Sequence, residues 1–247
     1  MRKRILEQPI DIITMEEASY IAKAALVNPK QLKIITLNPE MVVNASNNFE
    51  FQAAINNSNL IVPDGTGILW ALRLLNPGSY DDATRVPGIE LAERILVSVN
   101  ELKKKIAIFG GTKEILTKAI EAINQNHPNI EIVKAIDGYQ GKENDSEIAK
   151  EIANEKPNLI LVALGSPRQE IWINKNSFLF PQSIMIGIGG SLDIWSGKAN
   201  RAPKWFRDNH LEWFYRAITQ PKRTIRILKT LPAFVWMVIK EKMKNPE

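Results

Sequence analysis

The feature that most constrains the fold is a series of six short, nearly continuous apolar runs, each followed by polar residues or glycine. The runs lie at residues 32–37, 59–62, 105–109, 130–134, 158–164 and 183–188. Strands that are apolar on both faces are typical of parallel sheets covered by helices on both sides. The runs therefore predict the strands of one sheet that is buried on both faces.

Segments with helical patterns lie between these runs. The first starts at Thr14, where Glu17 completes a capping box. The others cover residues 49–57, 66–75, 88–101, 112–124, 146–154 and 169–176. This alternation predicts an α/β fold, namely a Rossmann-like, doubly wound, mostly parallel six-stranded sheet with right-handed crossovers.

After Gly190 the pattern changes, and no further strand is expected. Short helices are predicted at residues 203–209, 211–219, 222–230 and 233–244, separated at Pro221 and Pro232 because proline interrupts a helix. We expect two domains: an α/β domain at residues 1–196 and a helical C-terminal appendage at residues 197–247.

Charge is distributed unevenly between these two parts. Residues 197–247 contain 12 Lys and Arg against 4 Asp and Glu, a net charge of +8, which leaves −3 for the rest because the whole chain carries +5. The same segment holds three of the six tryptophans. A basic, aromatic-rich segment indicates a polyanionic partner. Because its charges are interleaved with Trp, Phe, Leu and Ile, it favours an anionic membrane surface over nucleic acid.

The chain has no cysteine and two histidines, which excludes disulfides, thiol nucleophiles and Cys-rich metal sites. A His-rich metal centre is disfavoured, although carboxylates alone can hold Mg²⁺. The basic N-terminus is not followed by the apolar core of a signal peptide, and no apolar stretch is long enough to span a membrane. We expect a cytoplasmic location and no cofactor.

Glycines and polar residues gather at the carboxyl ends of the expected strands, where α/β sheets bind ligands. They are Thr36, Asn38, Asp64, Gly110, Gly111, Asp137, Gln169, Gly189 and Gly190, with Arg85 on a further loop. Each has a plainer role: Asp137 is favoured as a turn residue, and Gly110-Gly111 is either a turn before a helix or a phosphate cradle. Turns and helix caps alone do not require so many glycines and polar residues along one edge of the sheet. Their occurrence together therefore predicts a binding site.

Several of these residues belong to short motifs that occur in one order. The motifs are Thr36-Leu-Asn-Pro, Pro63-Asp-Gly-Thr-Gly, Arg85-Val-Pro-Gly, Gly165-Ser-Pro-Arg-Gln-Glu, Gly187-x-Gly-Gly, Arg201-Ala-Pro-Lys-Trp and Leu211-Glu-Trp-Phe-Tyr-Arg. As a set, over about residues 11–226, they resemble the WecG/TagA/CpsF family of bacterial glycosyltransferases. Within it, the chain looks most like the members that transfer N-acetylmannosamine to build the linkage unit of wall teichoic acid.

The resemblance implies an inverting transfer from a UDP-sugar to a polyprenyl-diphosphate-linked sugar at the inner face of the cell membrane, without a metal. Such a transfer needs one base and a means to stabilise the leaving diphosphate. Asp64 is the expected base, with Thr36 and Asn38 positioning hydroxyl groups.

The other candidates are assigned to substrate binding. Arg85 and Gln169 are expected to contact sugar and diphosphate, Gly110 and Gly111 to let the backbone approach the nucleotide, and Asp137, Gly189 and Gly190 to line the same edge. The appendage supplies Arg216, Arg223 and Arg226 to offset the diphosphate charge. Asp137 and Asp193 are the alternative bases.

Three alternatives stay open beside this interpretation. One is a different donor in the same family, such as UDP-N-acetylmannosaminuronate or UDP-glucose. A nucleotide-dependent oxidoreductase is disfavoured because the first strand ends in Thr-Leu-Asn-Pro rather than in a G-x-G-x-x-G motif. A nucleic-acid-binding protein is the third. A homo-oligomer would be favoured if a detached appendage left an apolar face of the body bare.

Overall fold

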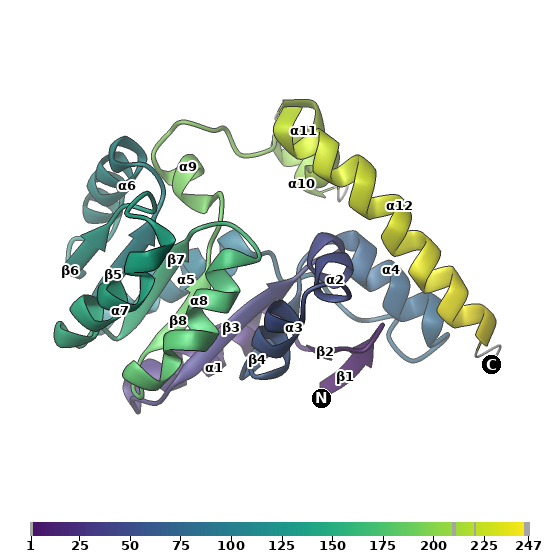
Figure 1. The fold of residues 1–247 in the computed structure, drawn as a ribbon, viewed down its shortest axis with the longest axis horizontal. Coiled ribbons are helices and arrows are strands. Elements are labelled where there is room, and N and C mark those ends of the chain that lie inside the picture. The colour runs from purple at the N-terminus through teal and green to yellow at the C-terminus, as the bar shows by residue number, and fades with distance from the viewer. Residues whose placement is uncertain (1, 209–210, 220, 245–247) are drawn as a thin grey trace.

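The computed structural model describes residues 2–208, 211–219 and 221–244. Its centre is a six-stranded, all-parallel sheet in the order β4-β3-β8-β7-β5-β6 (Figure 1). The strands are β3 (Leu32–Leu37), β4 (Leu60–Pro63), β5 (Lys105–Gly110), β6 (Glu131–Ile136), β7 (Leu159–Ala163) and β8 (Ile184–Gly187). The predicted fold class is confirmed, and each predicted strand lies within about two residues of the observed one.

Helices cover both faces of the sheet. One face carries α1 (Met15–Val27), α5 (Gly88–Glu101) and α6 (Lys113–Asn126), whose apolar residues form one core cluster with the strands. The other face carries α3 (Phe49–Asn56), α4 (Thr66–Leu75), α7 (Asp145–Asn154) and α8 (Arg168–Asn176), in two clusters. Single 3₁₀ turns lie at Lys142–Asn144 and Ser177–Leu179. The capping box of α1 is present, with Thr14 Oγ1 accepting from the Glu17 N–H at 3.1 Å.

The connections create two crevices at the carboxyl edge of the sheet. After β5 the chain continues into α6 on one face, whereas after the adjacent β7 it continues into α8 on the other. The neighbours β3 and β8 likewise lead to opposite faces, into α2 (Pro39–Ala45) and α9 (Ser191–Trp195). Ligands of open α/β sheets bind at such switch points, and the predicted site residues lie around them.

An N-terminal hairpin was not predicted. Strands β1 (Arg2–Ile5) and β2 (Gln8–Asp11) pair antiparallel, and Asp11 Oδ2 accepts a hydrogen bond from the Ile61 N–H at 2.9 Å. The hairpin thereby covers the exposed edge of β4. Its turn places Leu6 and Glu7 at φ +45° and +69°. Because these residues lack the Asn-Gly signature of two-residue hairpin turns, the sequence carried no signal for it.

The appendage ends in one long helix instead of two short ones. It consists of α10 (Lys204–Asp208), α11 (Glu212–Thr219) and α12 (Pro221–Lys244), and α12 continues through Pro232. The predicted break at Pro232 was therefore wrong. Phe234 and Val238 are fully buried in the cluster shared with α2 and α4, and this packing compensates for the hydrogen bond that proline removes. Figure 1 shows α12 running past α2 and α4.

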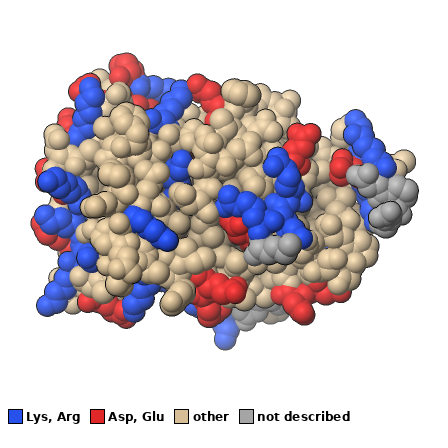
Figure 2. Space-filling model, turned by 90° about the horizontal axis from the view of Figure 1, so that it is seen from below, with Lys and Arg blue, Asp and Glu red and all other residues tan. Residues whose placement is uncertain are grey.

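Charges of both signs share the surface of the body. On the face seen in Figure 2, Lys and Arg side chains are interspersed with Asp and Glu, and much of the surface between them is uncharged. Exposed ion pairs such as Lys23–Glu101, at 2.7 Å, are part of this mixed surface. Within the described residues, no helix has both the length and the apolarity needed to cross a bilayer.

Candidate active site

Asp64 lies between the ends of two strands and the start of a helix. Its backbone N–H donates to the Leu37 carbonyl at 2.8 Å, and its Oδ2 accepts from the N–H of Gly88 at 3.2 Å. Gly88 is the first residue of α5, whose amino end favours a negative charge. These bonds hold a half-buried carboxylate at the carboxyl edge of β3 and β4.

Thr36 and Asp64 meet around the same glycine. A Cβ atom on Gly88 would lie 2.8 Å from Thr36 Oγ1, so only glycine allows α5 to begin this close to β3. Asn38 follows on the same strand end, and its Oδ1 accepts from the Met41 N–H at 3.0 Å as the N-cap of α2. Since that bond uses the oxygen of the amide, its nitrogen remains the group suited to a ligand.

A groove of about 1080 Å³ begins beside Asp64, at Thr66, and follows α4. One wall consists of α4 residues that include Leu69 and Trp70, and the opposite wall is the loop 83–87, which contains Arg85. Lys204 of α10 also lines it. Glu90 of α5 lines it as well and is paired with Arg201. Apolar walls with an excess of cationic over acidic groups suit a ligand that has an apolar chain and an anionic head.

Gln169 lies at the β8 end of the site with both ends of its amide engaged. Its Oε1 accepts from the Gly189 N–H at 3.1 Å, and its Nε2 donates to Glu170 Oε1 at 2.7 Å. A Cβ atom on Gly187 would lie 2.5 Å from that nitrogen, which explains the glycine. Gly190, next in the loop, is the N-cap of α9.

Gly110 and Gly111 lie at the second crevice, where three loops are joined. The Gly111 N–H donates to the Ala163 carbonyl at 3.1 Å, and the Gly138 N–H donates to the Gly111 carbonyl at 2.8 Å. Gly110 has φ +134°, and a Cβ atom there would lie 2.3 Å from the Ala163 oxygen. These glycines let the loops after β5, β6 and β7 approach closely at the amino end of α6.

Asp137 is a turn residue, as the sequence predicted. Its Oδ1 accepts from the Tyr139 N–H at 3.0 Å and its Oδ2 from Gln140 Nε2 at 2.6 Å. The carboxylate thus shapes the loop after β6. Asp193, the other alternative base, lies in α9 close to Gly190.

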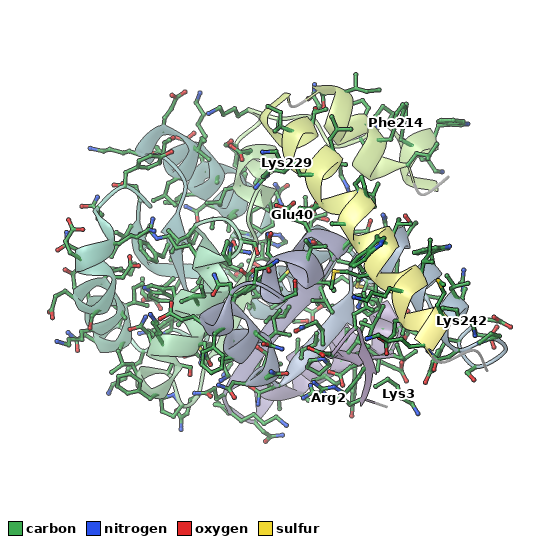
Figure 3. All side chains as sticks on the ribbon, turned by 45° about the vertical axis from the view of Figure 1, so that its right-hand side comes forward. Arg2, Lys3, Glu40, Phe214, Lys229 and Lys242 are labelled. Carbon is green, nitrogen blue, oxygen red and sulfur yellow. The ribbon has the colours of Figure 1, made fainter. Side chains whose placement is uncertain are left out.

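Arg226 connects the appendage to the site through a residue that the sequence analysis did not single out. Its Nη1 lies 3.6 Å from Oε1 of Glu40, in the first turn of α2 and two positions after Asn38. Figure 3 labels Glu40 and Lys229 on the body side of α12 and Phe214 on the outer side. The order Asn38-Pro39-Glu40 is a helix-start signature that could have identified both α2 and this acidic residue. The side chains of Arg216 and Arg223 lie outside the described part of the structure.

The carboxylates of the site are dispersed rather than clustered. Within the described ranges, no three His, Asp or Glu side chains are grouped so that they could hold a metal ion. Independence from metal remains a prediction.

Comparison with known proteins places these features in one family. The model of the "Glycosyl transferase WecG/TagA/CpsF family" matches residues 3–247. A protein of Staphylococcus aureus (strain NCTC 8325 / PS 47) is 38% identical over 243 residues, which are 97% of this chain and 93% of that protein. A protein of Bacillus subtilis (strain 168) is 36% identical, over 84% of this chain and 79% of that protein. A protein of Bacillus spizizenii (strain W23) is 34% identical, over 94% of this chain and 89% of that protein. All three bear the name N-acetylglucosaminyldiphosphoundecaprenol N-acetyl-beta-D-mannosaminyltransferase.

Proposed function

The chain belongs to the WecG/TagA/CpsF family of glycosyltransferases, and we propose that it transfers N-acetylmannosamine from its UDP derivative to N-acetylglucosamine on a polyprenyl diphosphate. The name that the three relatives share supports this donor and this acceptor. In the structure, the observation that carries the proposal is the Asp64 carboxylate, which lies two residues before the start of a groove lined by apolar and cationic residues and by Glu90.

Asp64 is proposed as the general base. An inverting transfer is one displacement in which a base removes the proton of the attacking hydroxyl. It does not need the second carboxylic acid of a glycosidase, because UDP leaves without being protonated. Thr36, which lies against the same Gly88 as Asp64, is proposed to orient a hydroxyl group of either sugar.

The leaving diphosphate is proposed to bind between the loops and the appendage. The Gly110–Gly111 turn lies at the amino end of α6, where free N–H groups and the helix dipole favour anions. Arg85 and Arg226 supply positive charge on the other side of the edge, and we assign Arg216 and Arg223 of α11 and α12 to the same role. These cations would take the place of a divalent metal.

The groove along α4 is proposed to hold the start of the polyprenyl chain. It begins next to the base at Thr66, so an acceptor lying in it would present its sugar to Asp64. Its apolar wall residues would contact isoprene units, whereas Lys204 would contact the diphosphate of the lipid acceptor.

The appendage is proposed to bind the inner face of the membrane. Among its described residues, the exposed large apolar side chains are Trp205, Phe214, Ile218, Ile225, Leu228, Trp236, Ile239 and Met243. Basic residues lie among them, and Lys240 Nζ is 4.7 Å from the Trp236 ring centre. Such a surface suits the headgroup layer, where each basic residue near anionic lipid contributes about 1 kcal/mol.

Substitution of the base tests this mechanism. Asp64→Asn preserves the size of the side chain and removes its basicity, so kcat should fall by about 10²–10⁴-fold while donor affinity by calorimetry is retained. Asp137→Asn is the matched control, because that carboxylate serves a turn. Near-normal turnover by Asp64→Asn would exclude Asp64 as the base.

A further inference from the structure

Glu170 is a buried acid that the proposed chemistry does not use. Its side chain belongs to a residue that is 5% exposed, and its Oε2 is buried without a hydrogen-bond partner. The Ser166 hydroxyl is also buried without a bond of normal geometry, although it lies near enough to influence the carboxyl. A buried carboxyl in such surroundings is costly when ionised, so its presence beside the site calls for an explanation.

The contacts of Glu170 lead directly to the site. Its Oε1 accepts from Gln169 Nε2 at 2.7 Å, and Gln169 Oε1 accepts from the Gly189 N–H at 3.1 Å. An N–H can donate only to the oxygen of an amide, so the two bonds together fix which way the Gln169 amide faces. The bond to Glu170 uses one of the two hydrogens on Nε2, which leaves the second for a ligand.

We propose that Glu170 is a positioning residue of the transfer reaction: it orients the Gln169 amide, which in turn holds the 187–190 loop beside the end of β3. The inference rests on the proposed function, because it takes Gln169 and this loop as part of the substrate site. The register of β8 with β3 places the loop beside the strand end that carries Thr36 and Asn38.

Glu170 orients Gln169 in its protonated, neutral form. Burial raises the pKa of its carboxyl; interactions with the Gln169 side chain, its own backbone and the Ser166 hydroxyl partly oppose this, and Glu40 of α2 raises the pKa further. Glu40 is itself paired with Arg226 of α12. Charges on the neighbouring helices are engaged elsewhere: Glu50 of α3 with Lys175 at 2.7 Å, and Asp145 of α7 with Arg168 at 2.8 Å. Lys33 lies near the opposite end of β3.

Four variants, two at Glu170 together with Gln169→Ala and its double variant with Glu170→Ala, separate positioning from direct catalysis. Glu170→Gln keeps a neutral acceptor for Gln169 and should retain kcat within about 3-fold, whereas Glu170→Ala should lower kcat about 10–100-fold with little change in the KM for the donor. In a Gln169→Ala background, Glu170→Ala should lower kcat little further, because both act through one chain of bonds. Equal losses in Glu170→Gln and Glu170→Ala, or additive losses in the double variant, would overturn the proposal.

Two further measurements do not depend on enzyme activity: the pH dependence of stability and amide hydrogen exchange. The unfolded chain releases the Glu170 proton near the ordinary pKa of about 4.3. Because the folded state retains that proton to a higher pH, the contribution of Glu170 to the unfolding free energy should fall as pH rises between the two pKa values. Glu170→Gln should lose this component, and Glu50→Gln, an exposed ion-pair control, should retain it. Identical pH dependence in the wild type and Glu170→Gln contradicts the neutral acid.

Amide hydrogen exchange tests the positioning directly. Glu170→Ala should speed exchange of the Gly189 N–H, because its acceptor on Gln169 is no longer fixed, and Glu170→Gln should leave it protected. Unchanged protection in Glu170→Ala would overturn the inference. This result and the stability curves hold for any transferred sugar, so they separate the failure of this inference from failure of the proposed function.

Discussion

Several residues of the candidate site have a packing role beside the chemical role proposed for them. The sequence predicts that the backbone approaches a nucleotide at Gly110, and the structure shows that a Cβ atom there would meet the Ala163 carbonyl. Asn38 caps α2, and the Gln169 amide is engaged with Gly189 and Glu170. The sequence was sufficient to predict which residue types lie at the strand ends. It was not sufficient to predict the contacts of Gly110 with Ala163 or of Gln169 with Gly189, because these residues come from segments far apart in the chain.

Gly110→Ala tests the packing role. The new Cβ would lie 2.3 Å from the Ala163 oxygen at φ +134°, so the backbone must shift, and we expect a loss of about 2–4 kcal/mol in the free energy of unfolding. Gly165→Ala is the control, with φ +77° and no atom within 4 Å, and should cost about 1–2 kcal/mol. Denaturant unfolding measures both, and equal costs would show that the close approach contributes nothing.

Among the elements, the appendage departs most from expectation. Pro232 predicted a break, because local sequence shows the missing donor but not the packing that compensates for it. Phe234 and Val238 of α12 complete the core around α2 and α4. Removing residues 197–247 would therefore expose a core surface as well as removing the proposed membrane-binding surface. Point substitutions on the two faces of α12 separate these effects.

The buried face of α12 should govern stability and the exposed face membrane binding. Phe234→Ala should cost about 3–5 kcal/mol, because the side chain is fully buried beside Trp70, at 6.5 Å between ring centres. Trp236→Ala, at a residue 61% exposed, should change stability by about 0.5 kcal/mol or less and weaken binding to anionic liposomes. Unimpaired flotation of Trp236→Ala with such liposomes would argue against docking through this face.

At the scale of the whole molecule, the sequence predicted the parallel sheet and the edge that carries the site. Apolar runs specify strands buried on both faces, and the strand ends must share one edge once the sheet is parallel. The position of α12 across α2, and with it the Glu40–Arg226 pair, depends on tertiary packing that has no local signature. The hairpin on β4 was missed for the same kind of reason.

The distribution of charge leads to the prediction that turnover does not require a divalent metal ion. We expect turnover to persist in excess EDTA, because the arginines of the site and the amino end of α6 are proposed to stabilise the diphosphate. The rate before and after chelation, with Mg²⁺ and Mn²⁺ added back, is the measurement. Loss of turnover with EDTA and recovery with either ion would show that a metal takes part.

The central claim is the identity of the transferred sugar and its acceptor. The most direct measurement is mass spectrometry of the products formed from N-acetylglucosamine on a lipid diphosphate with UDP-N-acetylmannosamine, its uronate, UDP-N-acetylglucosamine and UDP-glucose offered separately. We predict a disaccharide product that gains one N-acetylhexosamine, formed efficiently from UDP-N-acetylmannosamine alone and absent with Asp64→Asn. Preferential transfer from UDP-N-acetylglucosamine, UDP-glucose or the uronate, or transfer from none of these donors, would contradict the account.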